Sequence, residues 1–195
     1  INLIKKLLIN EYPFLSKYLR INYGLIPEVE NDKDYLMGGN SPLNWKVLKE
    51  DSNWLPEAEA MQHEEQRGRL FETMGCTGYA LNNVEEMIEL NKWGKSINRS
   101  DRFLNKISGT GVNGNNLSRV LEARRNYGFV EEADYPWDRD NFTWNEYYAT
   151  IPQSVKDKAL INNKRYVFGY DGVWATKSML VEALKFSPLY VGLYA

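Results

Sequence analysis

The feature that most constrains the fold is a long helix signal that begins at the single cysteine of the chain, Cys76. Apolar residues recur after it at steps of three and four positions, as expected for a helix: Ala80, Leu81, Val84, Met87, Ile88 and Leu90. We expect this helix to end near Gly94, because glycine commonly follows the last helical turn. One cysteine cannot form an internal disulfide, which excludes a small secreted domain built on cross-links.

Two shorter helices are predicted further along the chain. One runs over 117–128 and stops at a glycine, and the other lies near 177–185. Strands are predicted at 165–169 and 189–195, where Tyr, Val and Phe collect. Helices therefore precede strands, and this order predicts an α+β protein with a helical part followed by the start of a sheet part.

The first part of the chain is predicted to form an arm. Residues 2–20 have the apolar period of an amphipathic helix, which Pro13 kinks or breaks. Packing of this helix on the body of the protein is favoured over a role at a membrane surface. Residues 28–60 are rich in turn signals, which indicates an irregular segment.

Composition excludes several classes of function. The formal net charge is −2, so the chain lacks the basic field expected of a nucleic-acid-binding protein. No apolar run approaches the roughly 20 residues that a membrane span requires. Aromatic residues make up 13% of the chain, which argues against a disordered protein. We expect no metal and no cofactor, because the segment with Asp138 and Asp140 lacks the Gly and Glu of a calcium loop.

The position of Cys76 at a predicted helix start has a chemical consequence. A helix N-terminus carries partial positive charge and free N–H groups, which stabilise a thiolate and favour nucleophilic chemistry. Gly75 allows close approach of the backbone, so the same N–H groups can hold an oxyanion. A lone cysteine is also commonly a small buried apolar residue, and composition by itself favours that interpretation.

Several segments resemble, in the same order along the chain, motifs of the papain family of cysteine peptidases. Gln66-Arg67-Gly68 followed by Gly75-Cys76 resembles the Gln-Gly loop and the Gly-x-x-Cys helix start of that family. Residues 111–115 resemble its Gly-Cys-Asn-Gly-Gly segment, and residues 127–137 resemble its Tyr-Gly-Ile … Tyr-Pro-Tyr stretch closely. Residues 188–195 resemble the strand that begins its barrel half. The overall pattern is similar to divergent, disulfide-free members from bacterial viruses.

The resemblance implies a papain-like two-domain fold. It also implies an enzyme that hydrolyses a peptide or related amide bond. It implies an N-terminal helical arm or propeptide-like extension over 1–50, a helical domain over 51–160, and the start of an incomplete β-barrel domain over 161–195. By comparison with the family, Cys76 is the nucleophile and Gln66 donates to the oxyanion. Gly75, Asn113, Gly114 and Asn115 line the groove that binds a peptide or protein substrate.

The chain also departs from the family pattern. Thr77 stands where the family has Trp, and Gln66 lies ten positions before Cys76, a longer spacing than the family uses, which leaves Gln62 as a rival. His63 is the single histidine and precedes Cys76, so it is not assigned as the base; its expected role is that of a surface loop residue. We expect the catalytic His and Asn in a C-terminal part beyond residue 195.

Three functions stay open at this point. The first is a papain-like thiol hydrolase, and the second is a catalytically inactive papain-fold structural or binding protein, such as a virion component that contacts other virion proteins. In the third, the arm over 1–50 occludes the cleft as an inhibitory segment. Val112 replaces a disulfide cysteine of the family, which favours a reducing cytoplasm or a virus particle over a disulfide-forming secreted environment.

Overall fold

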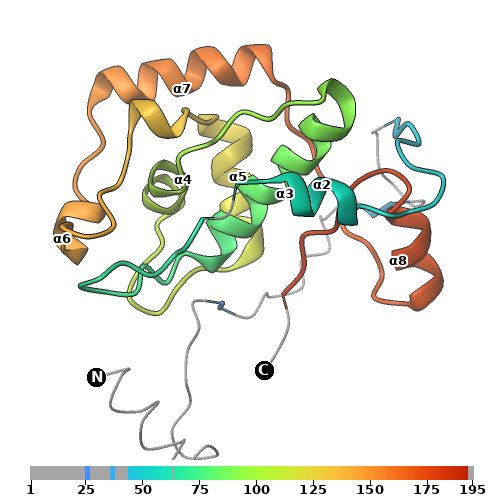
Figure 1. Cartoon of the computed structure of the whole chain (residues 1–195), viewed down its shortest axis with the longest axis horizontal. Coiled ribbons are helices and arrows are strands. Elements are labelled where there is room, and N and C mark those ends of the chain that lie inside the picture. The colour runs from blue at the N-terminus through green and yellow to red at the C-terminus, as the bar shows by residue number, and fades with distance from the viewer. Residues whose placement is uncertain (1–24, 27–35, 38–43, 63, 193–195) are drawn as a thin grey trace, which may run out of the picture.

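A computed structural model describes residues 25–26, 36–37, 44–62 and 64–192 of the 195-residue chain. The regular structure of these ranges consists of seven α-helices and one short 3-10 helix. They are α2 (Leu55–Ala60), α3 (Cys76–Trp93), α4 (Asp101–Ile107), α5 (Leu117–Tyr127), η2 (Glu132–Asp134), α6 (Trp144–Tyr147), α7 (Gln153–Arg165) and α8 (Lys177–Ala183). In Figure 1, α7 lies along one side of the helical body, and α6 and α8 lie at opposite ends.

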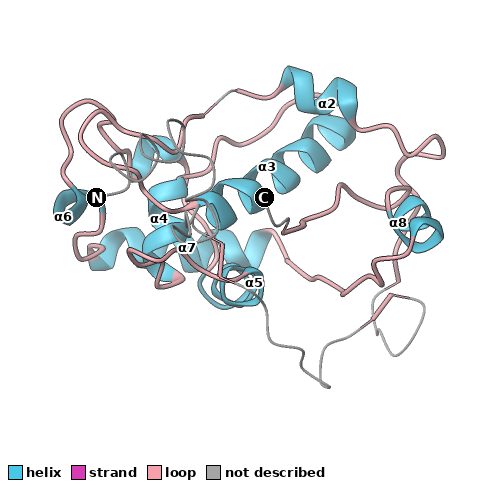
Figure 2. Cartoon of the chain, turned by 90° about the horizontal axis from the view of Figure 1, so that it is seen from below, coloured by secondary structure: helices cyan, strands magenta, loops and turns pink. Residues whose placement is uncertain are grey.

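The α+β prediction is wrong for the described residues, in which helices occur without any strand (Figure 2). Residues 166–169 and 189–192, from the two predicted strands, are irregular, and 193–195 lie outside the described residues. A strand needs a neighbour that pairs with it in register. Backbone pairing in the described part is limited to isolated bridges, such as Leu36 with Gly172. The incomplete β-barrel expected from residue 161 is therefore not observed.

The aromatic residues of the two predicted strands cover helices instead. Two clusters of buried apolar side chains form the core, one with Phe103, Val130, Tyr135, Ile151 and Ala159, and the other with Leu81, Leu104 and Val120. Phe168 and Tyr190 come from the predicted strands, and both pack against the second cluster. Their apolar surface is buried by side-chain contacts without backbone pairing, which explains why a strand-like composition gave no strand.

Three predicted helices are confirmed, and their ends show why they form. α3 starts at Cys76 and ends before Gly94, whose left-handed backbone (φ 67°) costs a glycine little. α5 begins after Asn116 and α8 begins after Thr176. Each of these two side chains accepts a backbone N–H of the first helical turn, which satisfies a group that the helix leaves unpaired. The helix predicted at 2–20 lies outside the described residues.

α4 and α7 were not predicted from the sequence. α4 is short and is capped by Ser100, whose hydroxyl accepts the N–H of Phe103. α7 buries only Ala159 among its residues, so its sequence shows little apolar period. It packs closely on Gly128, where an added Cβ would come within 2.2 Å of the Ala159 carbonyl oxygen. The contact with Gly128 therefore stabilises a helix that the apolar pattern of its own sequence does not predict.

α3 turns a charged face toward the interior, in contrast to its apolar pattern. Arg99 donates to Glu89 over 2.6 and 3.0 Å, and Arg124 donates to Glu85 over 2.7 and 2.8 Å. These carboxylates and guanidinium groups are buried, so each charge depends on its partner to offset the loss of water. Of the six apolar residues on the predicted core face, only Leu81 is buried, and five are partly buried: Ala80, Val84, Met87, Ile88 and Leu90.

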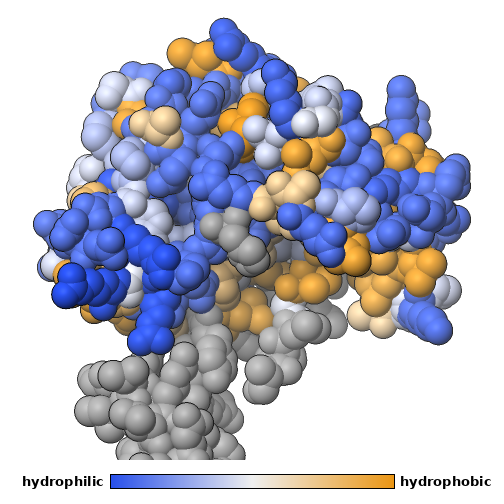
Figure 3. All heavy atoms as spheres, viewed as in Figure 1, coloured by the Kyte–Doolittle hydropathy of each residue, from blue (hydrophilic) through white to orange (hydrophobic). Residues whose placement is uncertain are grey.

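The segment before α2 is fastened to the region around α8. The indole N–H of Trp45 donates to Asp171 over 2.7 Å, and that of Trp54 donates to the carbonyl oxygen of Leu184 over 2.6 Å. Figure 3 shows apolar side chains exposed at the end of the molecule where α8 lies in Figure 1. In this region of the chain, Val47 and Val181 keep 43% and 49% of their surface. Among the helices of the described ranges, none has the length and apolar character to cross a membrane.

Candidate functional site

Cys76 is the first residue of α3, and its side chain is half-buried. The residue before it, Gly75, is the N-cap, and no side chain hydrogen-bonds to the helix from this position. The backbone N–H groups of Thr77 and Cys76 act to lower the pKa of its thiol. Cys76 opens a helix as the sequence predicted, and the free N–H groups of a helix start can stabilise a thiolate or an oxyanion, so its role as nucleophile stays a prediction.

The pKa of the Cys76 thiol is nevertheless raised above its ordinary value. Burial is the largest cause, and the negative charge of Glu72 adds to it. The N–H groups of Thr77 and Cys76 oppose the rise without reversing it. Helix geometry alone therefore does not produce the depressed thiol pKa expected from the sequence. A thiolate at neutral pH would need a cation next to the sulfur.

The backbone before Cys76 is held in a strained form. Met74 is 3% exposed and has a φ of 59°, which lies in the left-handed region that non-glycine residues seldom adopt. Thr73 fixes this turn from both sides: its hydroxyl accepts the N–H of Gly75 over 3.3 Å, and its carbonyl oxygen accepts the hydroxyl of Tyr148 over 2.7 Å. Strain of this kind persists only where neighbours enforce it, and it is common at functional sites.

The start of α3 packs against a single buried amide on α4. An added Cβ would lie 2.2 Å from the Asn105 side chain both at Gly75 and at Gly78. Asn105 is fully buried, and its Nδ2 donates to the hydroxyl of Tyr147 over 3.0 Å. Two glycines thus flank Cys76 because the amide leaves no room for larger side chains. The sequence analysis singled out Gly75 but missed Gly78 and Asn105, for which only the glycine spacing gave a signal.

Gln66 lies in a turn that leads back to the start of α3. Its carbonyl oxygen accepts the N–H of Thr73 over 3.3 Å, and the N–H of Gly68 donates to Phe71 over 3.0 Å. The longer spacing between Gln66 and Cys76 is taken up by this turn, which returns the chain to a point three residues before the cysteine. The Gln66 side chain is partly buried.

The predicted groove residues Asn113, Gly114 and Asn115 lie in a tight turn between α4 and α5. Gly111 and Gly114 exchange backbone hydrogen bonds of 2.8 and 3.2 Å, which leaves Val112 and Asn113 exposed at the tip. Asn115 is completely buried. Its amide donates to three oxygens of the preceding loop, at 3.1 to 3.2 Å. The side chain of Asn115 is thus hydrogen-bonded inside the protein, and its backbone carbonyl group contacts another segment.

That other segment belongs to the N-terminal arm. The N–H of Ile26 donates to the carbonyl oxygen of Asn115 over 2.7 Å, and Leu25 forms a parallel bridge with Asn115. The Leu25 side chain lies so close to Gly192 that an added Cβ there would approach it to 2.8 Å. The arm and the C-terminal segment therefore meet beside the turn that the sequence assigns to the groove.

The histidine that would serve as the base of a cysteine peptidase is not among the described residues. The single histidine of the sequence, His63, lies outside the described residues. Tyr190 donates its hydroxyl to the carbonyl oxygen of Thr77 over 2.8 Å, which ties the C-terminal segment to the first turn of α3. Across the described ranges, no group of three or more His, Cys, Asp or Glu residues is arranged to hold a metal ion.

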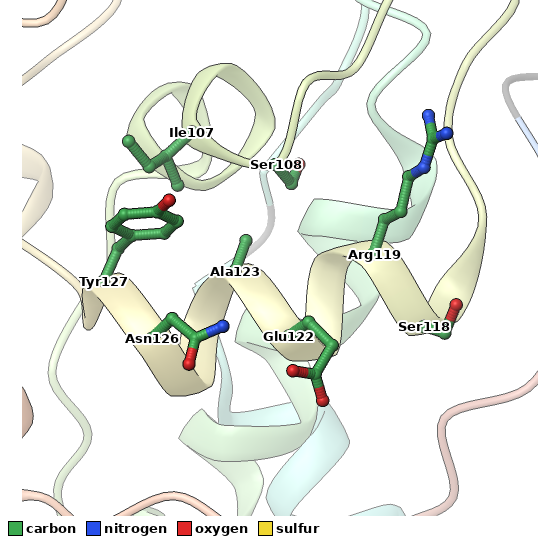
Figure 4. A pocket seen from close by; sticks show the side chains of 8 residues that line it. All are labelled: Ile107, Ser108, Ser118, Arg119, Glu122, Ala123, Asn126 and Tyr127. Atoms are coloured by element: carbon green, nitrogen blue, oxygen red, sulfur yellow. The ribbon is translucent and has the colours of Figure 1, made fainter. Parts of the chain in front are cut away.

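Two surface hollows lie away from Cys76. One, of about 290 Å³, opens between α4 and α5; Ile107 and Tyr127 point toward one another at one end of it, and Arg119 extends at the other (Figure 4). A second, of about 490 Å³, is lined by Trp93 and Tyr166, with Lys95 at its side. Neither hollow includes a residue predicted to be catalytic.

Comparisons with known proteins give a distant similarity to a solved structure. No family model matches the chain, and no curated protein matches it. Among solved structures, the chain is similar to the Amb a 11 cysteine protease, a major ragweed pollen allergen, in its proform. Identity is 18% and the TM-score is 0.37; the match covers 57% of this chain and 33% of that chain. A similarity of this size carries no conclusion about the fold or activity of this chain, and nothing in it supports the bacterial-virus type expected from the sequence.

Proposed function

We propose that the chain is a papain-like thiol hydrolase in which Cys76 attacks the carbonyl carbon of a peptide or related amide bond. The observation that carries this proposal is the position of the thiol on the first residue of an 18-residue helix, at the helix end where backbone N–H groups have no partner within the helix. The strained Met74 supports it, because the turn that presents the cysteine is held against its backbone preference.

In this mechanism the sulfur bonds to the carbonyl carbon, and the carbonyl oxygen becomes an oxyanion. The N–H of Cys76 and the side chain of Gln66 would donate to that oxyanion, since the turn that begins at Gln66 ends at the start of α3. Collapse of the intermediate releases the amine, which takes the proton that the base accepted from the thiol, and leaves a thioester. Water then hydrolyses the thioester to the acid and restores the thiol. The proposal assigns the exposed Asn113 and the backbone of Gly114 to substrate binding.

The thiol proton must pass to a base before attack. The raised pKa of Cys76 makes this requirement stricter, because little thiolate forms at neutral pH without a neighbouring cation. A histidine fulfils both needs: it accepts the proton and, once charged, stabilises the thiolate. The described residues contain no histidine, so the proposal requires a base from outside them.

The proposal also assigns the arm over 1–50 to control of this site. Ile26 is hydrogen-bonded to the backbone of Asn115, next to the groove residues, so this part of the arm occupies a backbone position that a substrate chain could use. Replacing Leu25 with Asp should weaken the contact of the arm with Gly192 and increase the rate at which Cys76 is labelled. An unchanged labelling rate would contradict an inhibitory arm without affecting the assignment of Cys76.

A peptide library with a fluorescent cleavage readout tests the hydrolase. We expect cleavage by the wild-type chain, none by Cys76→Ser, and full activity in Lys92→Gln, a control at the exposed far end of the same helix. Labelling adds a second measurement: a peptide bearing an electrophile should react with Cys76 faster than the same electrophile without a peptide. No cleavage, together with equal labelling rates, would rule the hydrolase out.

A non-catalytic papain-like binding protein is the second candidate, and the raised pKa of the thiol favours it. In that case wild type and Cys76→Ser would bind the same peptides with equal affinity, and neither would cleave them.

A further inference from the structure

The larger of the two hollows lies at the C-terminal ends of two helices. Trp93 is the last residue of α3, and Tyr166 directly follows α7. The link between α3 and α4 contributes Lys95 and Asn98, and the segment before η2 contributes Glu131. Its volume of about 490 Å³ falls within the range of about 300–1,000 Å³ that is typical of small-molecule sites.

The backbone around this hollow is held by hydrogen bonds to neighbouring elements. The N–H of Ile97 donates to the buried carboxylate of Glu89 over 2.8 Å. The carbonyl oxygen of Asn98 accepts the N–H of Glu132 over 2.9 Å, which joins the link to the segment that carries Glu131. The hollow is therefore formed before a ligand arrives, and binding requires little ordering of the chain.

Two aromatic side chains line the hollow. Trp93 keeps 56% of its surface exposed, although it is the largest apolar side chain at this end of α3. The ring of Tyr166 packs edge-on against the buried ring of Phe129, with 5.5 Å between the ring centroids. The core thus fixes Tyr166, while Trp93 stays open to solvent. Aromatic rings in such a place offer flat surfaces against which the apolar face of a ligand can pack.

The polar groups of the hollow offer both donors and acceptors. Asn98 donates from Nδ2 to Gln62 over 3.3 Å, but its Oδ1 is buried and accepts no hydrogen bond among the described residues. A buried acceptor without a donor is costly, so this oxygen favours a ligand that donates to it. Lys95 supplies a donor and Glu131 an acceptor, and neither takes part in the ion pairs of the described ranges. Hydroxyl groups match all three, because each both donates and accepts.

The charges around the hollow favour a neutral ligand. Lys95 would repel a cation and Glu131 would repel an anion, and the two formal charges cancel. The C-terminal ends of α3 and α7 carry partial negative charge. Basic residues in their last turns offset this charge: Lys92 on α3, and Lys164 and Arg165 on α7.

We propose that the hollow between the ends of α3 and α7 is a binding site for a neutral sugar. A sugar ring carries C–H groups on a face and hydroxyl groups around its edge. The face packs against Trp93 and Tyr166, and the hydroxyl groups bond to Lys95, Glu131 and the free oxygen of Asn98. The site lies away from Cys76 and does not depend on the proposed hydrolase.

Titration calorimetry with four neutral disaccharides tests the site: maltose, cellobiose, lactose and N,N′-diacetylchitobiose, each added to about 20 mM. We expect at least one to bind with a Kd of about 1 mM, an affinity that this range saturates. Choline and adenosine are titrated alongside, as a cation and as a flat aromatic ring. Binding of none of the four sugars would overturn the proposal, and so would binding of choline or adenosine in their place.

Variants place the binding at this hollow. Trp93→Ala should weaken it about tenfold, because the packing surface for the sugar face is lost, whereas Trp93→Phe should retain most of the affinity. Trp174→Ala is the matched control, since Trp174 is 62% exposed and does not line the hollow; its affinity should equal that of wild type. Equal affinities of Trp93→Ala and wild type would overturn the site. Cys76→Ser should bind as wild type does, so failure of the hydrolase proposal would leave this result intact.

Discussion

The amide of Asn105 lies directly against Gly75: a methyl group added to that glycine would come within 2.2 Å of the amide nitrogen. The same side chain also lies against Gly78, about one turn later in α3. Because Asn105 is fully buried and bonded to Tyr147, it cannot swing away without leaving polar groups unpaired. The position of Cys76 at the start of α3 is therefore fixed from α4.

Gly78→Ala should destabilise the protein by about 1–3 kcal/mol, because the new methyl group overpacks a closed interior site. Urea unfolding measures this loss. Gly111→Ala is the matched control, since no atom lies within 4 Å of a Cβ at that glycine, and its midpoint should barely change. Equal midpoints for Gly78→Ala and wild type would contradict the close contact with Asn105.

The rate of Cys76 alkylation by iodoacetamide should rise with pH through a midpoint above that of free cysteine, because burial and Glu72 both raise the thiol pKa. Glu72→Gln removes the neighbouring charge and should increase the rate at pH 7 by roughly twofold. Glu65→Gln, which is exposed, should leave the rate unchanged. A midpoint below that of free cysteine would contradict this expectation and would place a cation from outside the described residues beside the sulfur.

Glu85→Ala should cost about 3–5 kcal/mol, because it leaves the buried guanidinium of Arg124 without its carboxylate. Thermal or urea unfolding would report the loss. Glu182→Ala is the surface counterpart: its partner Lys185 stays in water, so the change should remain within about 0.5 kcal/mol. Equal losses of unfolding free energy in the two variants would show that the buried ion pairs of Arg124 do not stabilise the protein.

The protein should be more stable at pH 5 to 6 than at pH 8. Burial raises the pKa of Glu86 and of Glu132 to about 7 in each case. The folded chain therefore binds these protons more tightly than the unfolded chain, and stability is lost as pH rises from about 4.5 through 7. Urea unfolding at the two pH values should differ by about 1–3 kcal/mol. Replacing both residues with Gln should remove most of that difference.

The sequence predicted helices where apolar residues recur at helical steps, as in α3, α5 and α8. A cap alone was not sufficient, since α4 is capped by Ser100 and was not predicted. α7 escaped prediction because its place depends on Gly128, a residue 25 positions before its first residue, Gln153. The strands failed for a related reason: a strand depends on a partner that local sequence does not name.

Some features of the candidate site follow from local sequence, and others follow from tertiary contacts. The sequence by itself determined that the one cysteine opens a long helix after a glycine, because helix periodicity and capping are local properties. Only the tertiary structure decided that the thiol is half-buried near Glu72 and that Asn115 is buried rather than exposed. Burial, and the pKa values it sets, arise from contacts between segments distant in sequence, so no local pattern contains them.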